Sequence, residues 1–151
     1  MKLSRKCDYA LRALLTLADN HEQGVPISVR EIAERNDIPK RFLEHILLEL
    51  NRKGWVKSRP GRNGGYILGK NPKELTMGDV IRQFDGVLAP VGCVSTHDYK
   101  ECTQESTCRF RQLLVDIQKN TVRFMDGVDL SAVSHGDYVI KEEMFSEGAF
   151  I

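Results

Sequence analysis

The sequence predicts a mainly α-helical fold with one small β-hairpin, arranged as a winged helix-turn-helix that is followed by a long C-terminal helix. Three observations predict it. Apolar residues recur at helical spacing over residues 3–20, 39–53 and 106–126. A short capped helix and a tight turn separate the first two of these segments. The pattern then changes to a period of two on both sides of a glycine-rich turn.

The first predicted helix covers residues 3–20, where apolar side chains follow one another in steps of three and four residues. A second, short helix is expected after Ser28. Serine is a favourable N-cap, and Glu31 three residues later would complete a capping box. Together these features predict a first helix that packs against a short second one.

A turn at residues 36–39 leads to the third predicted helix, which covers residues 39–53 with Pro39 at its first position. Gly54 is placed to end this helix as a C′ glycine. The side chains expected to form its buried stripe are Phe42, Leu43, Ile46, Leu47 and Leu50.

Short strands are expected at residues 55–58 and 66–68, with a glycine-rich segment between them. The Asn63-Gly64 pair predicts a tight hairpin turn, because both residues accept a positive φ angle. The hairpin would form the wing that follows the third helix.

The second half of the chain contains fewer periodic segments. Thr76, with Asp79 three residues later, predicts a helix that ends at Gly86. A long helix over residues 106–126 and a short one near residues 129–134 are expected to follow. We therefore divide the chain into a winged helix-turn-helix (residues 1–86), a connector with a cysteine-rich loop (87–108, the cysteine loop), a dimerisation helix with a short helix (109–134) and a tail (135–151). The apolar side of the long helix would consist of Phe110, Leu113, Leu114, Ile117, Thr121 and Phe124.

Composition and charge limit the class of protein. With 151 residues, 41% of them hydrophobic and 28% charged, the chain has the size and balance of a soluble globular domain. It has neither a signal peptide pattern nor an apolar run of the ~20 residues that a membrane span needs, so we expect a cytoplasmic protein. Residues 1–70 hold 14 Lys/Arg and 8 Asp/Glu, whereas residues 71–151 hold 8 and 13. A basic first half suggests a polyanionic partner for that half.

The order of the predicted elements favours DNA as that partner. In a helix-turn-helix the second helix of the motif enters the major groove, and side chains near its N-terminus reach base edges. Seven Lys/Arg and two Glu fall between residues 40 and 62, in this helix and in the wing. We expect Lys53 and Lys57 to contact phosphates, which position the protein without specifying sequence. The candidates for base or groove contacts are Lys40, Arg41, Glu44, His45, Arg59 and Arg62.

Three of the four cysteines, Cys93, Cys102 and Cys108, fall within 16 residues of a segment without helical or strand periodicity. In a cytosolic chain such a group indicates metal or redox chemistry before structural disulfides. No Cys-x2-Cys pair is present, which argues against the common zinc knuckles. Three thiolates suit an iron–sulfur cluster whose fourth ligand comes from elsewhere. From the residues alone, His97 could complete a Cys3His site, and Asp8 could equally form an ion pair with Arg12 one helical turn away.

The chain resembles the BadM/Rrf-type winged-helix regulators, the family of the cluster regulators IscR, NsrR and RirA. The resemblance covers nearly the whole chain. It is carried by Met1-Lys2-Leu3-Ser4, residues 8–13 (Asp8 to Ala13), Ile32-Ala33, Phe42-Leu43-Glu44, residues 61–68 (Gly61 to Leu68), Asp79-Val80-Ile81 and the three clustered cysteines.

The resemblance implies a homodimer joined through the long C-terminal helix, with a cluster bound by Cys93, Cys102 and Cys108 and by one ligand that is not cysteine. In IscR-like members this ligand is a histidine three residues after the last cysteine, where this chain has Arg111. In NsrR-like members it is an aspartate on the first helix of the partner subunit, and Asp8 stands at the matching place. We therefore expect Asp8 as the fourth ligand, with His97 as the alternative. A 4Fe–4S cluster and the sensing of nitric oxide are favoured over a 2Fe–2S cluster and the sensing of iron or redox state.

Taken together, these features predict a homodimeric repressor that binds a palindromic operator in double-stranded DNA and has no membrane partner. Two alternatives stay open: a winged-helix regulator that binds zinc or switches through its thiols without a cluster, and a winged helix that binds protein. An enzyme is not expected, because the chain has no P-loop, no dinucleotide-binding glycine motif and no HExxH sequence.

Overall fold

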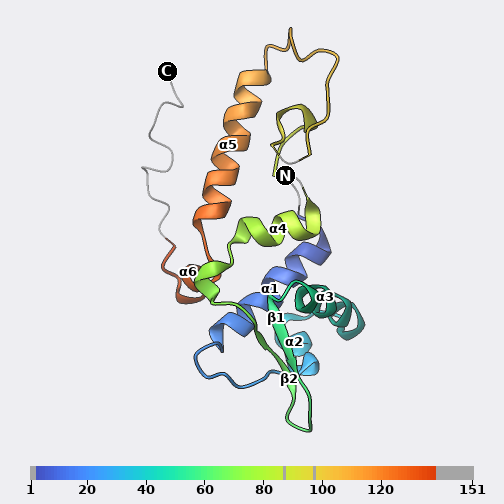
Figure 1. The fold of residues 1–151 in the computed structure, drawn as a ribbon, viewed down its shortest axis with the longest axis vertical. Coiled ribbons are helices and arrows are strands. Elements are labelled where there is room, and N and C mark those ends of the chain that lie inside the picture. Colours follow the sequence, from blue (N-terminus) through green and yellow to red (C-terminus); the bar gives the residue numbers. More distant parts are fainter. Residues whose placement is uncertain (1–2, 87, 97, 139–151) are drawn as a thin grey trace.

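The computed structural model describes residues 3–86, 88–96 and 98–138, and in this range it has the predicted order of helices and hairpin (Figure 1). The winged helix-turn-helix consists of α1 (Arg5–Asp19), α2 (Val29–Asn36), α3 (Lys40–Arg52), β1 (Val56–Arg59) and β2 (Gly65–Leu68). It is followed by α4 (Met77–Asp85), α5 (Arg111–Gly127), α6 (Leu130–His135) and two short 3-10 turns, η1 (Pro72–Glu74) and η2 (Gly92–Val94). No helix in the described ranges is both long and apolar enough to cross a bilayer.

α1 is the central helix of the core, since it contacts α2, α3, α4, α6 and β2. The Ser4 side chain caps it by accepting a hydrogen bond from the Cys7 backbone N–H. Its predicted apolar face is confirmed, because Ala10, Leu14 and Leu17 are buried against residues of α2 and α3. Cys7 is fully buried in a second cluster with Ile81 and Leu88, and it is therefore part of the core.

The turn between α2 and α3 depends on Asp37, which has a left-handed backbone with φ of 51° and ends α2. Ser28 caps α2 as predicted, by accepting a hydrogen bond from the Glu31 N–H. The second half of the predicted capping box is not formed, because the Glu31 carboxylate pairs with Arg35 at 2.5 Å. Pro39 is the N-cap of α3, one position before its predicted place inside the helix.

The buried stripe of α3 is confirmed for Leu43, Ile46, Leu47 and Leu50, but the prediction for Phe42 is wrong. Phe42 is 41% exposed and meets the edge of Tyr9, with ring centroids 5.7 Å apart. Helical spacing puts Phe42 at the border of the stripe, where contact with one half-buried ring replaces full burial. Gly54 follows α3 with φ of 73°, as expected of a C′ glycine.

The hairpin pairs β1 and β2 in antiparallel register from Val56 opposite Leu68 to Arg59 opposite Gly65. The predicted hairpin is confirmed, but the positive φ expected at Asn63 and Gly64 is wrong, since the positive φ of the tip is found at Gly61, at 116°. A hydrogen bond of 3.0 Å from the Gly64 N–H to the Gly61 carbonyl closes a longer loop. Gly64 is needed for space and not for a positive φ, because a Cβ there would overlap the Arg59 carbonyl oxygen.

α4 begins with the predicted capping box, in which Thr76 and Asp79 each bind the backbone N–H of the other. Burial alone would raise the pKa of Asp79, but hydrogen bonds from Thr76 and Arg82 outweigh burial and lower it. Gly86 ends α4 as predicted, with φ of 79°.

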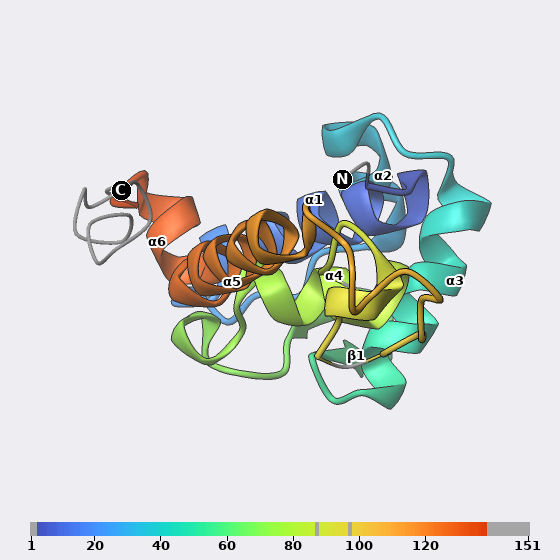
Figure 2. The same ribbon diagram turned by 90° about the horizontal axis from the view of Figure 1, so that it is seen from above.

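The long helix begins later than predicted, at Arg111 and not at residue 106. Residues 103–110 fold into turns instead, with N–H bonds from Thr107 to the Gln104 carbonyl and from Arg111 to the Cys108 carbonyl. α5 lies along the long axis of the molecule and runs from an N-terminal end distant from the winged helix-turn-helix toward α6 (Figure 1), and it passes over α4 in the second view (Figure 2). The short helix predicted near residues 129–134 is confirmed as α6.

Candidate DNA-binding surface and cysteine loop

All of the candidate DNA-binding side chains reach the surface, and they lie on α3, at the residue directly after it (Lys53) or on the wing. Glu44 is half-buried, and the others are exposed: Lys40, Arg41, His45, Lys53, Lys57, Arg59 and Arg62. The buried stripe of α3 faces the core, so the opposite side of the helix presents these polar residues to solvent. The hairpin extends beyond α3 at one end of the molecule (Figure 1).

Most of the basic residues on this surface have no acidic partner within the described part of the chain. Elsewhere, cations of the helices are paired, for example Lys6 with Glu49 at 2.6 Å and Arg30 with Glu34 at 2.7 Å. Among the cations of α3 and the wing, the one that has an acidic partner in the described ranges is Lys40, which pairs with Glu44 at 3.8 Å. The unpaired cations of this surface are Arg41, Arg52, Lys53, Lys57, Arg59 and Arg62. Such a concentration of positive charge without internal partners suits a phosphate backbone.

The wing is attached to the segment that precedes α2, which the sequence did not predict. Ile27 and Tyr66 exchange backbone hydrogen bonds of 3.0 and 2.8 Å. A Cβ at Gly65 would overlap the Ile27 carbonyl oxygen, so the two backbones can approach each other only at a glycine. No periodicity rule finds a single bridge of this kind, although two consecutive glycines before Tyr66 are a signal of close backbone approach.

The three clustered cysteines lie in the segment between α4 and α5, and all of them are free thiols. Cys93 is in η2 and half-buried, Cys102 is exposed, and Cys108 is half-buried one turn before α5. His97, the alternative fourth ligand, lies outside the described residues. Within the described residues no group of three or more His, Cys, Asp or Glu side chains gathers closely enough to hold a metal ion.

A polar network inside the cysteine loop was not predicted. Arg111 contacts one carboxylate oxygen of Glu105 at 3.0 and 2.5 Å, and the Tyr99 hydroxyl donates to the other at 2.7 Å. The hydrogen bonds from Tyr99 and Arg111 lower the pKa of Glu105. The pKa of Arg111 is raised, first by Glu105 and also by the charge of Cys93, so the guanidinium lies within electrostatic range of that thiol. Residues six apart are too distant to touch in a regular helix or strand, so no periodicity predicts this pair.

Asp8, the expected fourth ligand, lies half-buried on α1 and pairs with Arg12 in the same chain. Both carboxylate oxygens are engaged, at 3.0 Å by Nε and at 2.7 Å by Nη2. Both side chains are more than 40% exposed, so this i,i+4 pair contributes only about 0.3–0.5 kcal/mol. The ion pair anticipated as the alternative role of Asp8 is therefore present, but it is too weak to hold the carboxylate against a stronger partner.

The donor set fits an iron–sulfur cluster in its chemistry. None of the three cysteines of the loop is committed to a disulfide, and soft thiolate ligands are those that iron–sulfur clusters prefer. Cys7 is unsuited to ligation, because burial first, and then the charge of Asp85 and a hydrogen bond to it, raise the pKa of its thiol to about 12.

Comparison with known proteins agrees with this architecture. A family model described as "Rrf2: Iron-dependent Transcriptional regulator" matches residues 3–136. A putative rrf2-like HTH-type transcriptional regulator of Rhodobacter capsulatus is 39% identical over 133 residues, which cover 85% of this chain and 89% of that protein. The HTH-type transcriptional regulator NsrR of Geobacillus kaustophilus is 33% identical over 131 residues, with 87% and 88% covered.

A solved structure shows the same arrangement of elements. CymR, described as the global cysteine regulator of Bacillus subtilis, superposes with a TM-score of 0.77 at 30% identity, over 90% of this chain and 98% of that one. The match of the family model to most of the chain, the relatives and the shared fold lead to one assignment. This chain belongs to the Rrf2 family of DNA-binding transcriptional regulators.

Proposed function

We propose that the protein is a homodimeric repressor that binds a palindromic operator and senses nitric oxide, iron or redox state through an iron–sulfur cluster. Its ligands would be Cys93, Cys102 and Cys108 of one subunit and Asp8 of the partner subunit. The observation that carries the proposal is the presence of three free thiols in one loop, beside a helix whose apolar face is uncovered.

The dimer is supported by the exposed side of α5. Phe110, Leu113 and Ile117 are 69%, 57% and 44% exposed, and they follow one another at helical spacing. Within the described chain, the one buried side chain of α5 is Gln118, whose amide donates a hydrogen bond to Thr96. α5 is a 17-residue amphipathic helix whose apolar row is exposed to solvent in the single chain. We expect α5 of a second subunit to cover this row.

DNA recognition is supported by the exposed side of α3. Arg41 has the donor geometry for guanine, and Glu44 can accept a hydrogen bond from cytosine N4. Arg59 ends β1 and Arg62 lies in the turn of the wing, and both are exposed where a minor groove or phosphates would lie. The homodimer would place two copies of α3 in half-sites about one DNA turn apart.

Two competing roles of Asp8 supply a switch in this proposal. When bound, the cluster would supply iron that accepts thiolate and carboxylate ligands, of which the hard carboxylate oxygen is the more easily displaced. In the form described here Asp8 pairs with Arg12, and α1 contacts every helix of the winged helix-turn-helix as well as α4 and α6. A change in the partner of Asp8 therefore acts on the helix that organises the DNA-binding core. A shift between two states from 1:99 to 99:1 needs ~5.5 kcal/mol of differential binding.

The experiment compares DNA affinity before and after cluster assembly. Protein reconstituted anaerobically with iron and sulfide, and the same protein stripped by chelation, are titrated onto a palindromic site obtained by in vitro selection. A sensor is supported if the reconstituted and stripped proteins differ at least tenfold in DNA affinity. Treatment of the reconstituted protein with nitric oxide or an iron chelator should then change its affinity to that of the stripped protein. Equal affinity of both forms contradicts it.

A thiol-switched or zinc-bound regulator without a cluster is the second candidate. It is favoured by the exposed, free thiol of Cys102 and by the similarity to a protein described as a global cysteine regulator. A colourless protein with stoichiometric zinc, or with DNA affinity that follows reversible oxidation of the thiols, would favour this candidate. The family assignment weighs against the remaining alternative, a winged helix that binds protein in place of DNA.

A further inference from the structure

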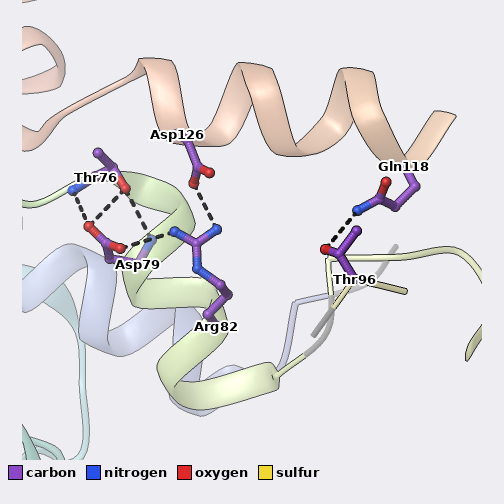
Figure 3. A network of polar contacts seen from close by, with 6 residues as sticks. All are labelled: Thr76, Asp79, Arg82, Thr96, Gln118 and Asp126. Carbon is purple, nitrogen blue, oxygen red and sulfur yellow. Dashed lines mark hydrogen bonds and ion pairs between the residues drawn. The ribbon is translucent and has the colours of Figure 1, made fainter. Parts of the chain in front are cut away.

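Arg82 of α4 links two carboxylates that belong to different parts of the molecule. Its guanidinium contacts Asp79, at the start of α4, at 3.0 Å and Asp126, near the end of α5, at 2.8 Å (Figure 3). The Arg82 side chain is 23% exposed, which makes it the more buried partner of both ion pairs. Burial alone would lower the pKa of Arg82, but the two carboxylates outweigh burial and raise it.

Asp126 lies directly against the backbone of α4, at Gly78. A Cβ at Gly78 would overlap the Asp126 carboxylate oxygen that pairs with Arg82, and it would come within 3.2 Å of the Arg82 Nη1 atom. The φ of Gly78 does not require glycine, since it is not among the positive angles. The missing side chain at this position therefore serves the approach of Asp126 to Arg82.

Other contacts join α5 to α4 and to the cysteine loop. Just beyond the C-terminal end of α5, the Met77 N–H donates to the Val128 carbonyl at 2.9 Å and the Leu130 N–H to the Leu75 carbonyl at 3.0 Å. These bonds fix one end of α5 to the start of α4. Further along the helix, Met125 and Val122 pack against the apolar cluster that includes Ile81, and a hydrogen bond of 3.5 Å joins Gln118 to Thr96 (Figure 3).

With one end of α5 fixed, the side-chain contacts next to it decide the direction in which the rest of the helix extends. Asp126 is two residues before the fixed point and bonds to α4, which itself packs against α1 of the winged helix-turn-helix. In a dimer joined through α5, the direction of α5 relative to α1 determines how far apart the two copies of α3 lie.

We propose that Arg82 and Asp126 are positioning residues for DNA recognition, because their ion pair fixes the direction of α5 relative to the winged helix-turn-helix and so sets the spacing of the two α3 helices. The inference rests on one part of the proposed function, the dimer joined through α5. It does not depend on which metal or redox group the cysteine loop binds.

The test measures how strictly the protein requires one half-site spacing. A palindromic site selected with the wild-type protein is compared with two derivatives that have one base pair added or removed at the centre. Each change moves the half-sites by about 3.4 Å and rotates them by about a tenth of a turn. The ratio of affinities for the selected and altered sites is measured by fluorescence anisotropy, together with the affinity for a single half-site and the oligomeric state.

Two variants break the ion pair in different ways. Asp126→Asn removes the charge, whereas Gly78→Ala displaces the carboxylate and at the same time improves the helix propensity of α4. The matched control is Asp116→Asn, the same substitution on the same helix, at a residue that accepts a hydrogen bond from Gln112 of α5 itself.

For the wild type and the control we expect at least tenfold discrimination against the altered spacings. For both Asp126→Asn and Gly78→Ala the ratio falls at least fivefold, while half-site affinity and dimerisation stay unchanged. If the ion pair were purely structural, the two variants would change thermal stability but not the ratio of affinities for the selected and altered sites. The change in stability would then depend on how each substitution affects the stability of its helix. The inference is overturned if the wild type is a dimer and both variants discriminate against the altered spacings as strongly as the wild type does. A monomeric wild type without spacing preference overturns the proposed dimer, and the inference with it.

Discussion

Ile27 and Tyr66 exchange two backbone hydrogen bonds, of 3.0 and 2.8 Å, and so attach the wing to the segment that leads into α2. The wing is thereby attached to the core by this bridge as well as by the contacts of β1 with α3. Its orientation relative to α3 is set before DNA binds, which reduces the conformational entropy that binding would otherwise cost.

Gly65→Ala should detach the wing, because the new methyl group overlaps the Ile27 carbonyl. We expect a loss of about 1–3 kcal/mol in the free energy of unfolding, the usual cost of forcing atoms into a packed site. Urea unfolding measures the loss, and DNA affinity should fall with it. Gln23→Ala, at an exposed position in the turn that follows α1, is the control and should leave both unchanged. An unfolding midpoint for Gly65→Ala equal to that of the wild type would show that the bridge is unimportant.

Arg59→Ala and Arg62→Ala should weaken DNA binding in a salt-dependent way. Neither arginine has an acidic partner in the described part of the chain, so each is free to replace a counterion on a phosphate. Each substitution should reduce the slope of log affinity against log salt concentration by about one. Lys73→Ala, an exposed residue of η1 next to α6, is the control and should leave the slope unchanged. Slopes that stay at the wild-type value in both arginine variants would remove the wing from the DNA interface.

Leu113→Asp should dissociate the dimer. Leu113 is exposed in the single chain and belongs to the apolar row of α5, so an aspartate there would place a charge in the dimer interface. Sedimentation equilibrium should show at least about a tenfold rise in the dissociation constant, equivalent to ~1.4 kcal/mol. Lys119→Asp, on α5 but outside the apolar row, is the matched control. If both variants dimerise as the wild type does, α5 is not the interface.

The buried thiol of Cys7 should make the protein less stable in alkali. Its pKa is raised from 9.0 to about 12, by burial first and then by Asp85, so the native state keeps the proton that the unfolded chain loses. Below pH 9 both states are protonated and the group adds no pH dependence. Between pH 9 and about 12 the unfolded chain binds fewer protons, and stability should fall by about 1.4 kcal/mol per pH unit.

The contribution of Cys7 is the difference between wild type and Cys7→Ala, since other groups also titrate in alkali. The variant loses stability at every pH through its cavity, but its stability should decline less steeply above pH 9. Parallel curves for the two proteins would mean that Cys7 ionises normally in the native state. Alkylation at neutral pH gives an independent check, because exposed Cys102 should react while Cys7 stays protected.

The helical core could be predicted from the sequence because burial of one helix face leaves a period in the chain. The stripes of α1 and α3 and the capping box at Thr76 and Asp79 were found in this way, since each depends on residues three or four apart. The start of α5 was placed too early, because polar residues that could begin a helix instead form turns within the cysteine loop. The turn of the wing was misassigned, because Gly61 adopts the positive φ expected of Asn63 and Gly64.

The candidate site was predictable in its residues but not in its geometry. The basic character of α3 and the wing follows from composition, and the exposure of those side chains follows from the buried stripe opposite them. The contacts of Arg111 with Glu105 and of Arg82 with Asp126 depend on how the chain turns between distant residues, and no local period records that. The predicted tail, residues 135–151, is described only as far as Tyr138, which is exposed.

In the proposed sensor, Asp8 and the three cysteines of the loop hold an iron–sulfur cluster. The most direct measurement is an anaerobic visible absorption spectrum after reconstitution, with iron, sulfide and zinc counts, on wild type, Asp8→Ala and Arg12→Ala. Arg12→Ala removes the same ion pair but keeps the carboxylate, so it separates ligation from helix stability. We expect a brown wild type and a brown Arg12→Ala protein with equal spectra, and an altered spectrum or lower iron content in Asp8→Ala. A wild type that stays colourless, or variants with identical spectra, would show that Asp8 and the cysteines do not hold a cluster.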